Sequence, residues 1–292
     1  MSVNYVSLEC SLEMTTNSLS IRPLSNALGA EILGLDLRDD FSAERFSQIL
    51  RTWHDSLVIL FRNQTLSEED QWQFGLRFGP LSAGHIRELQ SGHEGVVYVS
   101  NVRKDGKPIG ILPDGEMQFH SDQCYRELPS QGSMLYAIEI PRSGGNTLFA
   151  NCYRAYETLP EAVKSRLTGL KALQAYDYNL NPTERAREIS KDVPTWVHPV
   201  VRTHPATGRK ALYVNRLMTV RIEGLPERES DELLGMLFDH LEQPQFIYEH
   251  VWRAGDVLMW DNRCTLHART TFDPTQTRVL RRTTLKGEPV LA

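Results

Sequence analysis

The sequence predicts a mainly β fold of the jelly-roll type, with helices inserted between the strands and flanking them. Many short segments alternate apolar and polar residues or form brief apolar runs, and both patterns are typical of strands. Four such segments follow one another near the C-terminus, at residues 245–252, 257–262, 264–268 and 278–285. A strand-rich chain of this kind fits a jelly roll better than a doubly wound sheet.

The N-terminal part is expected to begin with a flexible tail, residues 1–18, which precedes a single domain at residues 19–292. A chain of 292 residues is long for one domain, but β-sandwiches and barrels often reach this size. Residues 20–40 alternate apolar and polar positions and carry glycines, which predicts short strands and turns.

Two helices and one buried strand are expected next along the chain. Ser42 can cap a helix whose apolar residues recur at helical spacing. The apolar run LVILF, residues 57–61, is typical of a buried strand. Ser67 and Asp70 resemble a capping box, which predicts the start of the second helix.

Residues 82–116 show no sustained periodicity, and they contain the turn-forming stretches DGKPIG and LPDGE. A long irregular segment inside a compact domain is usually an active-site loop or disordered. This segment leads to His120, which is a candidate metal ligand. We therefore predict an active-site lid around residues 82–118.

The second half of the chain mixes strands with helices. A strand at 133–141 leads through a glycine-rich turn into another strand, and the pattern at 153–170 is helical. Residues 177–195 are polar and are expected to form a loop or a mobile helix. Residues 197–215 predict a β-hairpin, and 226–243 predict an amphipathic helix.

Composition and charge exclude several classes of function. The net charge is −5 and no basic run is present, so nucleic-acid binding has little support. No apolar stretch approaches the roughly 20 residues that span a bilayer, and the polar N-terminus does not resemble a signal peptide. The four cysteines form no CxxC pair, which predicts free thiols and a reduced, cytoplasmic setting.

Three residues suggest a metal site. His120 and Asp122 are separated by one residue, so they would share one face if the segment were a strand. His267, on a distant predicted strand, could supply a second imidazole. Two histidines and one carboxylate form the facial triad of non-haem Fe(II) oxygenases. A His-x-Asp pair alone is weak, because a histidine is more often a core or surface residue.

The strand after His267 carries three arginines. Arg278 and Arg282 share one face, and inward-pointing cations there would need an anionic partner such as a dicarboxylate co-substrate. The alternative is a solvent-exposed edge strand, and we accept it for Arg281 on the other face. Thr147, in the motif GGNT, has a hydroxyl that can donate to a carboxylate, although the motif alone would be an ordinary turn.

The sequence resembles the Fe(II)/2-oxoglutarate-dependent dioxygenases of the taurine/2,4-D dioxygenase family. The resemblance is carried by LVILFRNQTLSEEDQWQFGLRFGPL, FHSDQCYRELPSQGSMLYAIEIPRSGGNTLFAN and WDNRCTLHARTTFDPTQTRVLRRTTL. With two further segments, the match runs from about residue 20 to 287. The spacing is specific, since Arg278 and Arg282 follow His267 by 11 and 15 residues.

The resemblance implies a role for each of these residues. The implied iron ligands are His120, Asp122 and His267. Arg278 would pair with the distal carboxylate of 2-oxoglutarate, helped by Thr147. Arg282 would lie close to the co-substrate and to an anionic group of the primary substrate. The family fold is a double-stranded β-helix, or jelly roll, which agrees with the pattern of strands.

The implied reaction is the hydroxylation of a C–H bond of a small anionic substrate with O2, releasing succinate and CO2. Partners other than small molecules are not expected, apart from a second copy of the chain in a dimer or tetramer. Phe119 stands where the family often has tryptophan, and the lid does not match the taurine enzymes closely, although His85 lies near their substrate-binding histidine. Taurine is therefore not expected to be the substrate.

Two other classes of protein share part of this pattern. A cupin-like hydrolase or isomerase using Zn or Mn would have the same His and carboxylate set, but it would not need the paired arginines. A non-catalytic, ligand-binding jelly roll would need neither the aligned metal ligands nor the inward cations. Cys124, close to Asp122, is expected to be a small core residue rather than a ligand.

Overall fold

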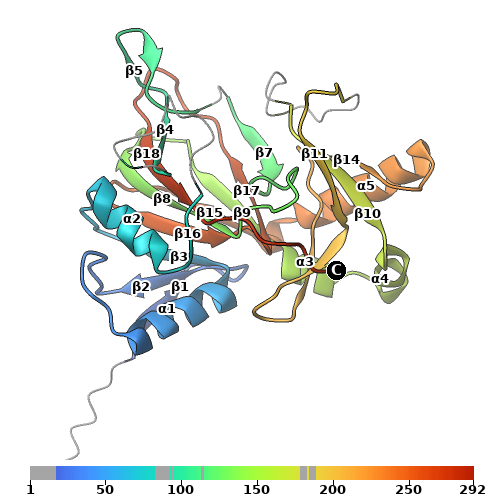
Figure 1. The fold of residues 1–292 in the computed structure, drawn as a ribbon, viewed down its shortest axis with the longest axis horizontal. Coiled ribbons are helices and arrows are strands. Elements are labelled where there is room, and N and C mark those ends of the chain that lie inside the picture. The colour runs from blue at the N-terminus through green and yellow to red at the C-terminus, as the bar shows by residue number, and fades with distance from the viewer. Residues whose placement is uncertain (1–17, 83–92, 94, 113–114, 178–182, 184–188) are drawn as a thin grey trace, which may run out of the picture.

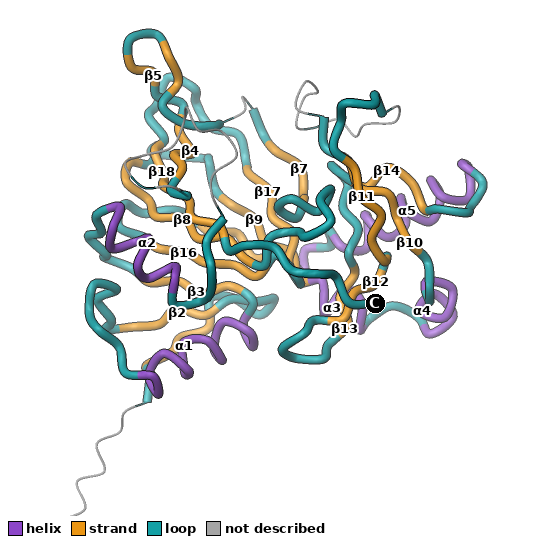
Figure 2. Tube along the Cα trace, viewed as in Figure 1, coloured by secondary structure: helices purple, strands orange, loops and turns teal. Residues whose placement is uncertain are grey.

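The two largest β-sheets, of seven and four strands, face each other at the centre of the fold, and the helices lie outside them (Figure 1). Three smaller sheets complete the strands that the structure describes. The structure is a computed structural model, and it describes residues 18–82, 93, 95–112, 115–177, 183 and 189–292. Strands occupy the central layers, and helices lie at the periphery (Figure 2). This arrangement confirms the predicted mainly β, jelly-roll fold.

The larger sheet has seven strands drawn from all parts of the chain. In spatial order they are β1 (Ser20–Pro23), β2 (Ala30–Leu33), β3 (Val58–Phe61), β16 (Val257–Asp261), β8 (Gly132–Glu139), β18 (Val279–Thr284) and β4 (Val97–Ser100). All neighbouring pairs are antiparallel except β2 and β3. Segments more than one hundred residues apart therefore lie side by side at its centre.

The smaller sheet carries both histidines of the predicted metal site. Its four antiparallel strands are, in order, β15 (Ile247–His250), β9 (Thr147–Asn151), β17 (Thr265–Arg269) and β7 (Met117–His120). The main apolar core lies between the two sheets and includes Leu258 and Leu280 from the larger sheet and Phe149 from the smaller one.

The strand β3 shows why the sequence of a central strand in this fold is continuously apolar. Val58 and Leu60 face the main core, whereas Ile59 and Phe61 face a second core on the outer side of the large sheet. A strand that is buried on both faces needs apolar residues at every position. The prediction of a buried strand at 57–61 is thus confirmed.

Two helices cover this outer core, α1 (Ala43–Ser56) and α2 (Glu68–Leu76). The side chain of Ser42 accepts a backbone N–H at the start of α1, as predicted. At the start of α2, Ser67 and Asp70 form the predicted capping box, in which each side chain accepts the backbone N–H of the other residue. Both helix starts are therefore encoded by local side-chain chemistry.

The second half of the chain adds a smaller layer beside the small sheet (Figure 1). Its elements are α3 (Cys152–Glu157), α4 (Glu161–Leu167), β10 (Lys171–Ala175), β11 (Thr195–Pro199), β12 (Val201–Thr203), β13 (Lys210–Leu212), β14 (Thr219–Ile222), α5 (Glu227–Leu241) and the 3-10 helix η2 (Pro244–Phe246). The predicted hairpin is β12 with β13, and the predicted amphipathic helix is α5. The helical pattern at 153–170 forms two helices because Pro160 ends the first region and precedes α4.

Part of the segment predicted to be irregular forms regular strands. β4 pairs with β18 at the edge of the large sheet, and β5 (Arg103–Lys104) forms a short hairpin with β6 (Lys107–Pro108). The prediction of an irregular segment was wrong for these residues, because pairing with a neighbouring strand stabilises them. Residues 1–17 of the expected tail, His85 and much of 177–195 lie outside the described residues.

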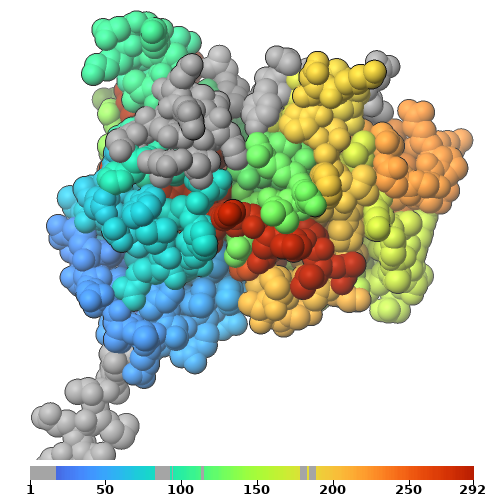
Figure 3. Space-filling model, in the orientation of Figure 1, coloured from blue at the N-terminus to red at the C-terminus, as the bar shows by residue number. Residues whose placement is uncertain are grey.

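The C-terminal segment, residues 285–292, follows β18. It crosses the molecule between the N-terminal part and the smaller layer (Figure 3). Isolated bridges join Gly287 to Ser130 and Leu291 to Thr203. The segment therefore fixes the loop that precedes β8. In the part of the chain that the structure describes, no helix has the length and apolar character needed to cross a bilayer.

Candidate active site

His120 and His267 meet because their strands pair in register. They are direct partners in the antiparallel pair of β7 and β17, so both side chains point to the same face of the small sheet. Their ring centroids are 4.1 Å apart. The rings of Trp260 and Phe149 pack beside His267, with centroids at 4.8 and 6.3 Å, and form an apolar wall around this imidazole.

Asp122 completes the cluster, but from a turn and not from a strand. β7 ends at His120, and Asp122 lies in the turn that follows. Its Oδ1 atom lies 3.8 Å from Nε2 of His267. One potential ligand atom from each of His120, Asp122 and His267 lies within 4.8 Å of the other two. The structure thus brings the three predicted residues together, although only the two histidines use strand geometry.

Hydrogen bonding and burial set the protonation states of the cluster. Nδ1 of His120 lies 2.9 Å from the carbonyl oxygen of Gln118, which fixes the proton on Nδ1 and leaves the Nε2 lone pair available. Burial lowers the pKa of His120, and burial with the neighbouring His120 lowers that of His267 to about 3. Burial alone would raise the pKa of Asp122, but His267 and Arg282 outweigh it and hold the pKa at about 2. Two neutral imidazoles and one carboxylate match a divalent metal.

Arg278 is a buried cation whose surroundings suit an anionic ligand. Its Nε and Nη2 donate to the carbonyl oxygen of Gly145 at 3.2 and 3.1 Å, and its buried Nη1 has no hydrogen-bond partner among the described residues. No carboxylate of the described residues pairs with it, and burial together with Arg269 lowers its pKa to about 9. A buried, unpaired guanidinium is costly, so a carboxylate placed against Nη1 would satisfy both its charge and its hydrogen bonding.

Thr147 stands at the start of β9, directly after the glycine turn that contacts Arg278. Its hydroxyl oxygen accepts the indole N–H of Trp252 at 3.0 Å. Because an indole N–H can only donate, the proton of Thr147 stays available for another acceptor. Gly145 itself has φ +65, and a Cβ atom there would lie 3.1 Å from Nε of Arg278. The turn therefore needs glycine for its backbone conformation and for the close approach of the guanidinium.

The alternation of β18 places Arg282 near the cluster and Arg281 on the opposite face. Nη1 of Arg282 lies 3.9 Å from Oδ1 of Asp122, and about a third of its side chain (32%) is exposed. Arg282 therefore stands between the cluster and solvent, where it can contact a small molecule.

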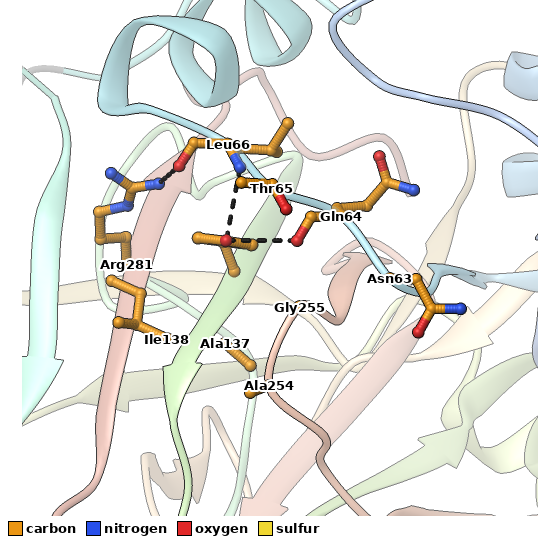
Figure 4. A pocket seen from close by; sticks show the side chains of 10 residues that line it. Asn63, Gln64, Thr65, Leu66, Ala137, Ile138, Ala254, Gly255 and Arg281 are labelled. Carbon is orange, nitrogen blue, oxygen red and sulfur yellow. Dashed lines mark hydrogen bonds between the residues drawn. The ribbon is translucent and has the colours of Figure 1, made fainter.

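The expectation that Arg281 is solvent-exposed was wrong. Its guanidinium is buried and donates to the carbonyl oxygen of Leu66, in the loop before α2, at 2.6 Å (Figure 4). It also stacks over the ring of Tyr136. The adjacent cavity of about 510 Å³ is also lined by Gln64 and Gly255. This cavity lies on the outer face of the large sheet, which separates it from the histidines, and Arg281 serves there as a buried anchor for the loop.

A second group of potential metal ligands, His204, Asp261 and Cys264, is better explained as structural. Nδ1 of His204 accepts the backbone N–H groups of Ala206 and Thr207, so its Nε2 carries the proton and donates to Asp261 at 3.0 Å. Asp261 also accepts three hydrogen bonds from Arg263. Burial raises the pKa of Cys264 well above the usual thiol value. Both histidine nitrogens are therefore already used. Cys124 is likewise a buried thiol, as expected.

The fold and the cluster together define a jelly-roll protein that has a two-histidine, one-carboxylate cluster and a buried arginine with an unused donor. The family model "Taurine catabolism dioxygenase TauD, TfdA family" matches residues 20–284, and the chain belongs to this family. It is therefore an alpha-ketoglutarate-dependent dioxygenase, that is, an oxidoreductase that uses 2-oxoglutarate.

Three similar proteins show how far the likeness extends. The alpha-ketoglutarate-dependent 2,4-dichlorophenoxyacetate dioxygenase of Cupriavidus pinatubonensis is 34% identical, over 94% of this chain and 100% of that protein. The alpha-ketoglutarate-dependent sulfate ester dioxygenase of Pseudomonas putida is 32% identical, over 92% of this chain and 90% of that protein. A crystal structure of AAD-2 with Mn(II) and N-oxalylglycine superposes with a TM-score of 0.78 at 30% identity, over 94% of this chain and 100% of that one.

Proposed function

We propose that this chain uses Fe(II), 2-oxoglutarate and O2 to hydroxylate a C–H bond of a small anionic organic substrate. The proposal rests mainly on one observation. Two neutral imidazoles and a carboxylate converge in one cluster, and a buried arginine with an unused donor interacts with Arg269, two residues after His267. In the overall reaction one oxygen atom of O2 enters the substrate as a hydroxyl group, and the other enters the succinate that forms as 2-oxoglutarate loses CO2.

The residues of the chain would divide the work as follows. His120, Asp122 and His267 would hold the iron, which when bound supplies the activation of O2. Arg278 would orient the co-substrate by pairing with its distal carboxylate, and the proton of Thr147 would add a hydrogen bond to the same group. The rings around His267 exclude water from this side of the cluster.

Arg282 would hold the anionic group of the primary substrate. Its position beside Asp122 and its partial exposure support this role. The relatives named above act, by their names, on a phenoxyacetate and on sulfate esters, both of which are anionic. We propose a substrate of this class, an aryloxyalkanoate, a sulfate ester or a related organic acid. The parts of the predicted lid, around residues 82–118, that lie outside β4 and β7 would cover it. A single domain at 19–292, assembly into a dimer or tetramer and a cytoplasmic location are further parts of the proposal.

The metal and co-substrate roles can be tested without knowing the substrate. Fe(II) and 2-oxoglutarate are added to the metal-free protein under nitrogen, and the visible spectrum is searched for a metal-to-ligand charge-transfer band. We expect the band in the wild type and in the control His240→Gln, whose histidine lies on α5, and its loss in His120→Ala. A folded wild-type protein without a band would contradict the proposal.

The substrate class can be tested by succinate release. A panel of phenoxyalkanoates, alkyl sulfates and alkylsulfonates is compared with neutral analogues that lack the anionic group. We expect release coupled to product formation only for anionic members. Equal coupled turnover of a neutral analogue would contradict the role of Arg282.

A further inference from the structure

The two oxygens of the Asp122 carboxylate have different surroundings. Oδ1 faces His267 and Arg282 at 3.8 and 3.9 Å. Oδ2 accepts the hydroxyl proton of Ser133 at 2.6 Å. Since Asp122 lies in a turn and not in a strand, the sheet does not fix its orientation. A side-chain contact must select which oxygen faces the histidines.

Ser133 is the last of three buried side chains that are linked in series by hydrogen bonds. Trp260 donates its indole N–H to Oδ1 of Asn262 at 2.8 Å, and Nδ2 of Asn262 donates to the Ser133 hydroxyl at 3.1 Å. The side chains of Trp260, Asn262 and Ser133 are all about 1% exposed. In such buried surroundings, leaving one of these hydrogen bonds unmade would be costly.

Trp260 determines the direction of every hydrogen bond in this series of side chains. The indole N–H can only donate, so the amide oxygen of Asn262 must face Trp260 and its NH2 group must face Ser133. The Ser133 hydroxyl then accepts from Asn262, and its single proton is left for Asp122. The Ser133 hydroxyl therefore acts as a donor, and not as an acceptor, toward Oδ2.

The backbone holds these residues in place. Trp260 and Ser133 are direct partners on the central strands β16 and β8. The backbone N–H of Asn262 donates to Gln131 at 3.0 Å, and the Ser121 hydroxyl donates to the backbone oxygen of Asn262 at 2.9 Å. The turn that carries Asp122 is thus tied to the centre of the large sheet at two neighbouring points.

We propose that Trp260, Asn262 and Ser133 form a positioning relay that occupies Oδ2 of Asp122 and presents Oδ1 alone to the metal. The inference rests on the proposed function, because it concerns the ligand role of Asp122. With Oδ2 engaged, the carboxylate would contribute one ligand atom, Oδ1, to the metal. Without the Ser133 proton, both oxygens can turn toward the metal or away from it.

The test compares the Mn(II) affinity of full-length variants, measured by the electron paramagnetic resonance signal of free Mn(II). Ser133→Ala removes the donor, and we expect about 10-fold weaker Mn(II) binding. A loss of this size is typical when a residue that hydrogen-bonds to a metal ligand is removed. Ser133→Thr keeps a hydroxyl and should bind within about 2-fold of the wild type. Ser130→Ala is the matched control, since Ser130 is buried nearby and its hydroxyl has no partner among the described residues.

The outcomes separate the relay from the proposed function. A wild type that binds no Mn(II) contradicts the metal site itself. A wild type that binds, with a folded Ser133→Ala that binds equally well and gives the same charge-transfer band with Fe(II) and 2-oxoglutarate, overturns the relay alone. If Ser133→Ala does not fold, Trp260→Phe removes the indole N–H and keeps most of the ring. It should also weaken Mn(II) binding, and unchanged affinity there would overturn the proposal.

Discussion

Arg278 illustrates how burial turns a common residue into a specific binding group. Two of its donors are used by the carbonyl oxygen of Gly145, which orients the guanidinium and leaves Nη1 for a ligand. A lysine at this position would be a point charge without the second, orienting contact. The proposed binding of the co-substrate therefore depends on the geometry of one guanidinium as much as on its charge.

Replacing Arg278 should separate co-substrate binding from metal binding. Arg278→Met is expected to raise the KM for 2-oxoglutarate about 100-fold, because it leaves a carboxylate buried without its charged partner. The Mn(II) affinity should stay within about 2-fold, since Arg278 lies outside the three proposed ligands. Steady-state kinetics and Mn(II) titration measure the two quantities, and the exposed Arg221→Met serves as the control. A KM within 2-fold of the wild type would argue against the assignment.

His267 should make the metal-free protein sensitive to acid. Its pKa in the folded protein is about 3, below the ordinary value of 6.5. Between these values the unfolded chain binds a proton that the folded protein does not, so the free energy of unfolding falls as the pH falls. The slope from one such group is about 1.4 kcal/mol per pH unit. Above pH 6.5 the group has no effect, because it is neutral in both states.

Urea unfolding of the metal-free protein with a chelator, between pH 4 and pH 6.5, measures this slope. His267→Gln cannot bind the proton in either state, so its stability should depend less steeply on pH, by about 1.4 kcal/mol per unit. Equal slopes for the two proteins would show that His267 is not held neutral by burial.

At the scale of the element, β18 shows how one strand serves two purposes. Arg282 faces Asp122 and the two histidines, and its neighbour Arg281 faces the outer core, where it contacts Leu66 and Tyr136. The two side chains differ in role because successive residues of a strand point to opposite sides. Adjacent, chemically identical residues should therefore give opposite results when replaced.

Arg281→Met should lower the free energy of unfolding by about 1–3 kcal/mol, because the buried carbonyl oxygen of Leu66 loses its donor. The kinetic constants should change little. Arg282→Met should leave stability nearly unchanged and raise the KM for an anionic substrate about 10-fold or more, since this partly exposed cation is proposed to hold its charge. Urea unfolding and steady-state kinetics on both variants distinguish the roles, and the same pattern of effects in both would contradict them.

The same elements show which features a sequence can predict. The start of α1 at Ser42 and the buried strand β3 follow from patterns a few residues long. The three candidate metal ligands were predicted because their types and spacing fit both a facial triad and a known family. The structure then brings them within one cluster.

Features that depend on contacts between distant segments could not be predicted. Asn262 and Ser133 are 129 residues apart, and nothing in the local pattern of either marks it as a partner of Asp122. Trp252 reaches Thr147 across 105 residues in the same way. The burial of Arg281 depends on a loop more than two hundred residues away. Such contacts follow from the order of strands in the sheets, which periodicity does not determine.

At the scale of the whole molecule, the C-terminal segment fixes a loop that leads directly into the site. Gly287 pairs with Ser130, just before β8 and its residue Ser133. A Cβ atom at Gly287 would lie 2.0 Å from the backbone oxygen of Leu128. Because the obstacle is backbone and not the end of a flexible side chain, either the segment or the loop would have to move.

Gly287→Ala is therefore expected to destabilise the protein by about 3 kcal/mol, the cost of forcing extra volume into a closely packed contact. Gly235→Ala, within α5, provides a matched control, because a Cβ atom there meets nothing within 4 Å. Alanine is also the better helix former, so this variant should be more stable than the wild type by up to about 1 kcal/mol.

The midpoints and slopes of urea unfolding measure both effects. If Gly287→Ala unfolded at the wild-type urea concentration, the C-terminal segment would not be held against the loop as the structure shows. Weaker Mn(II) binding in the same variant would further show that the segment supports the position of Ser133.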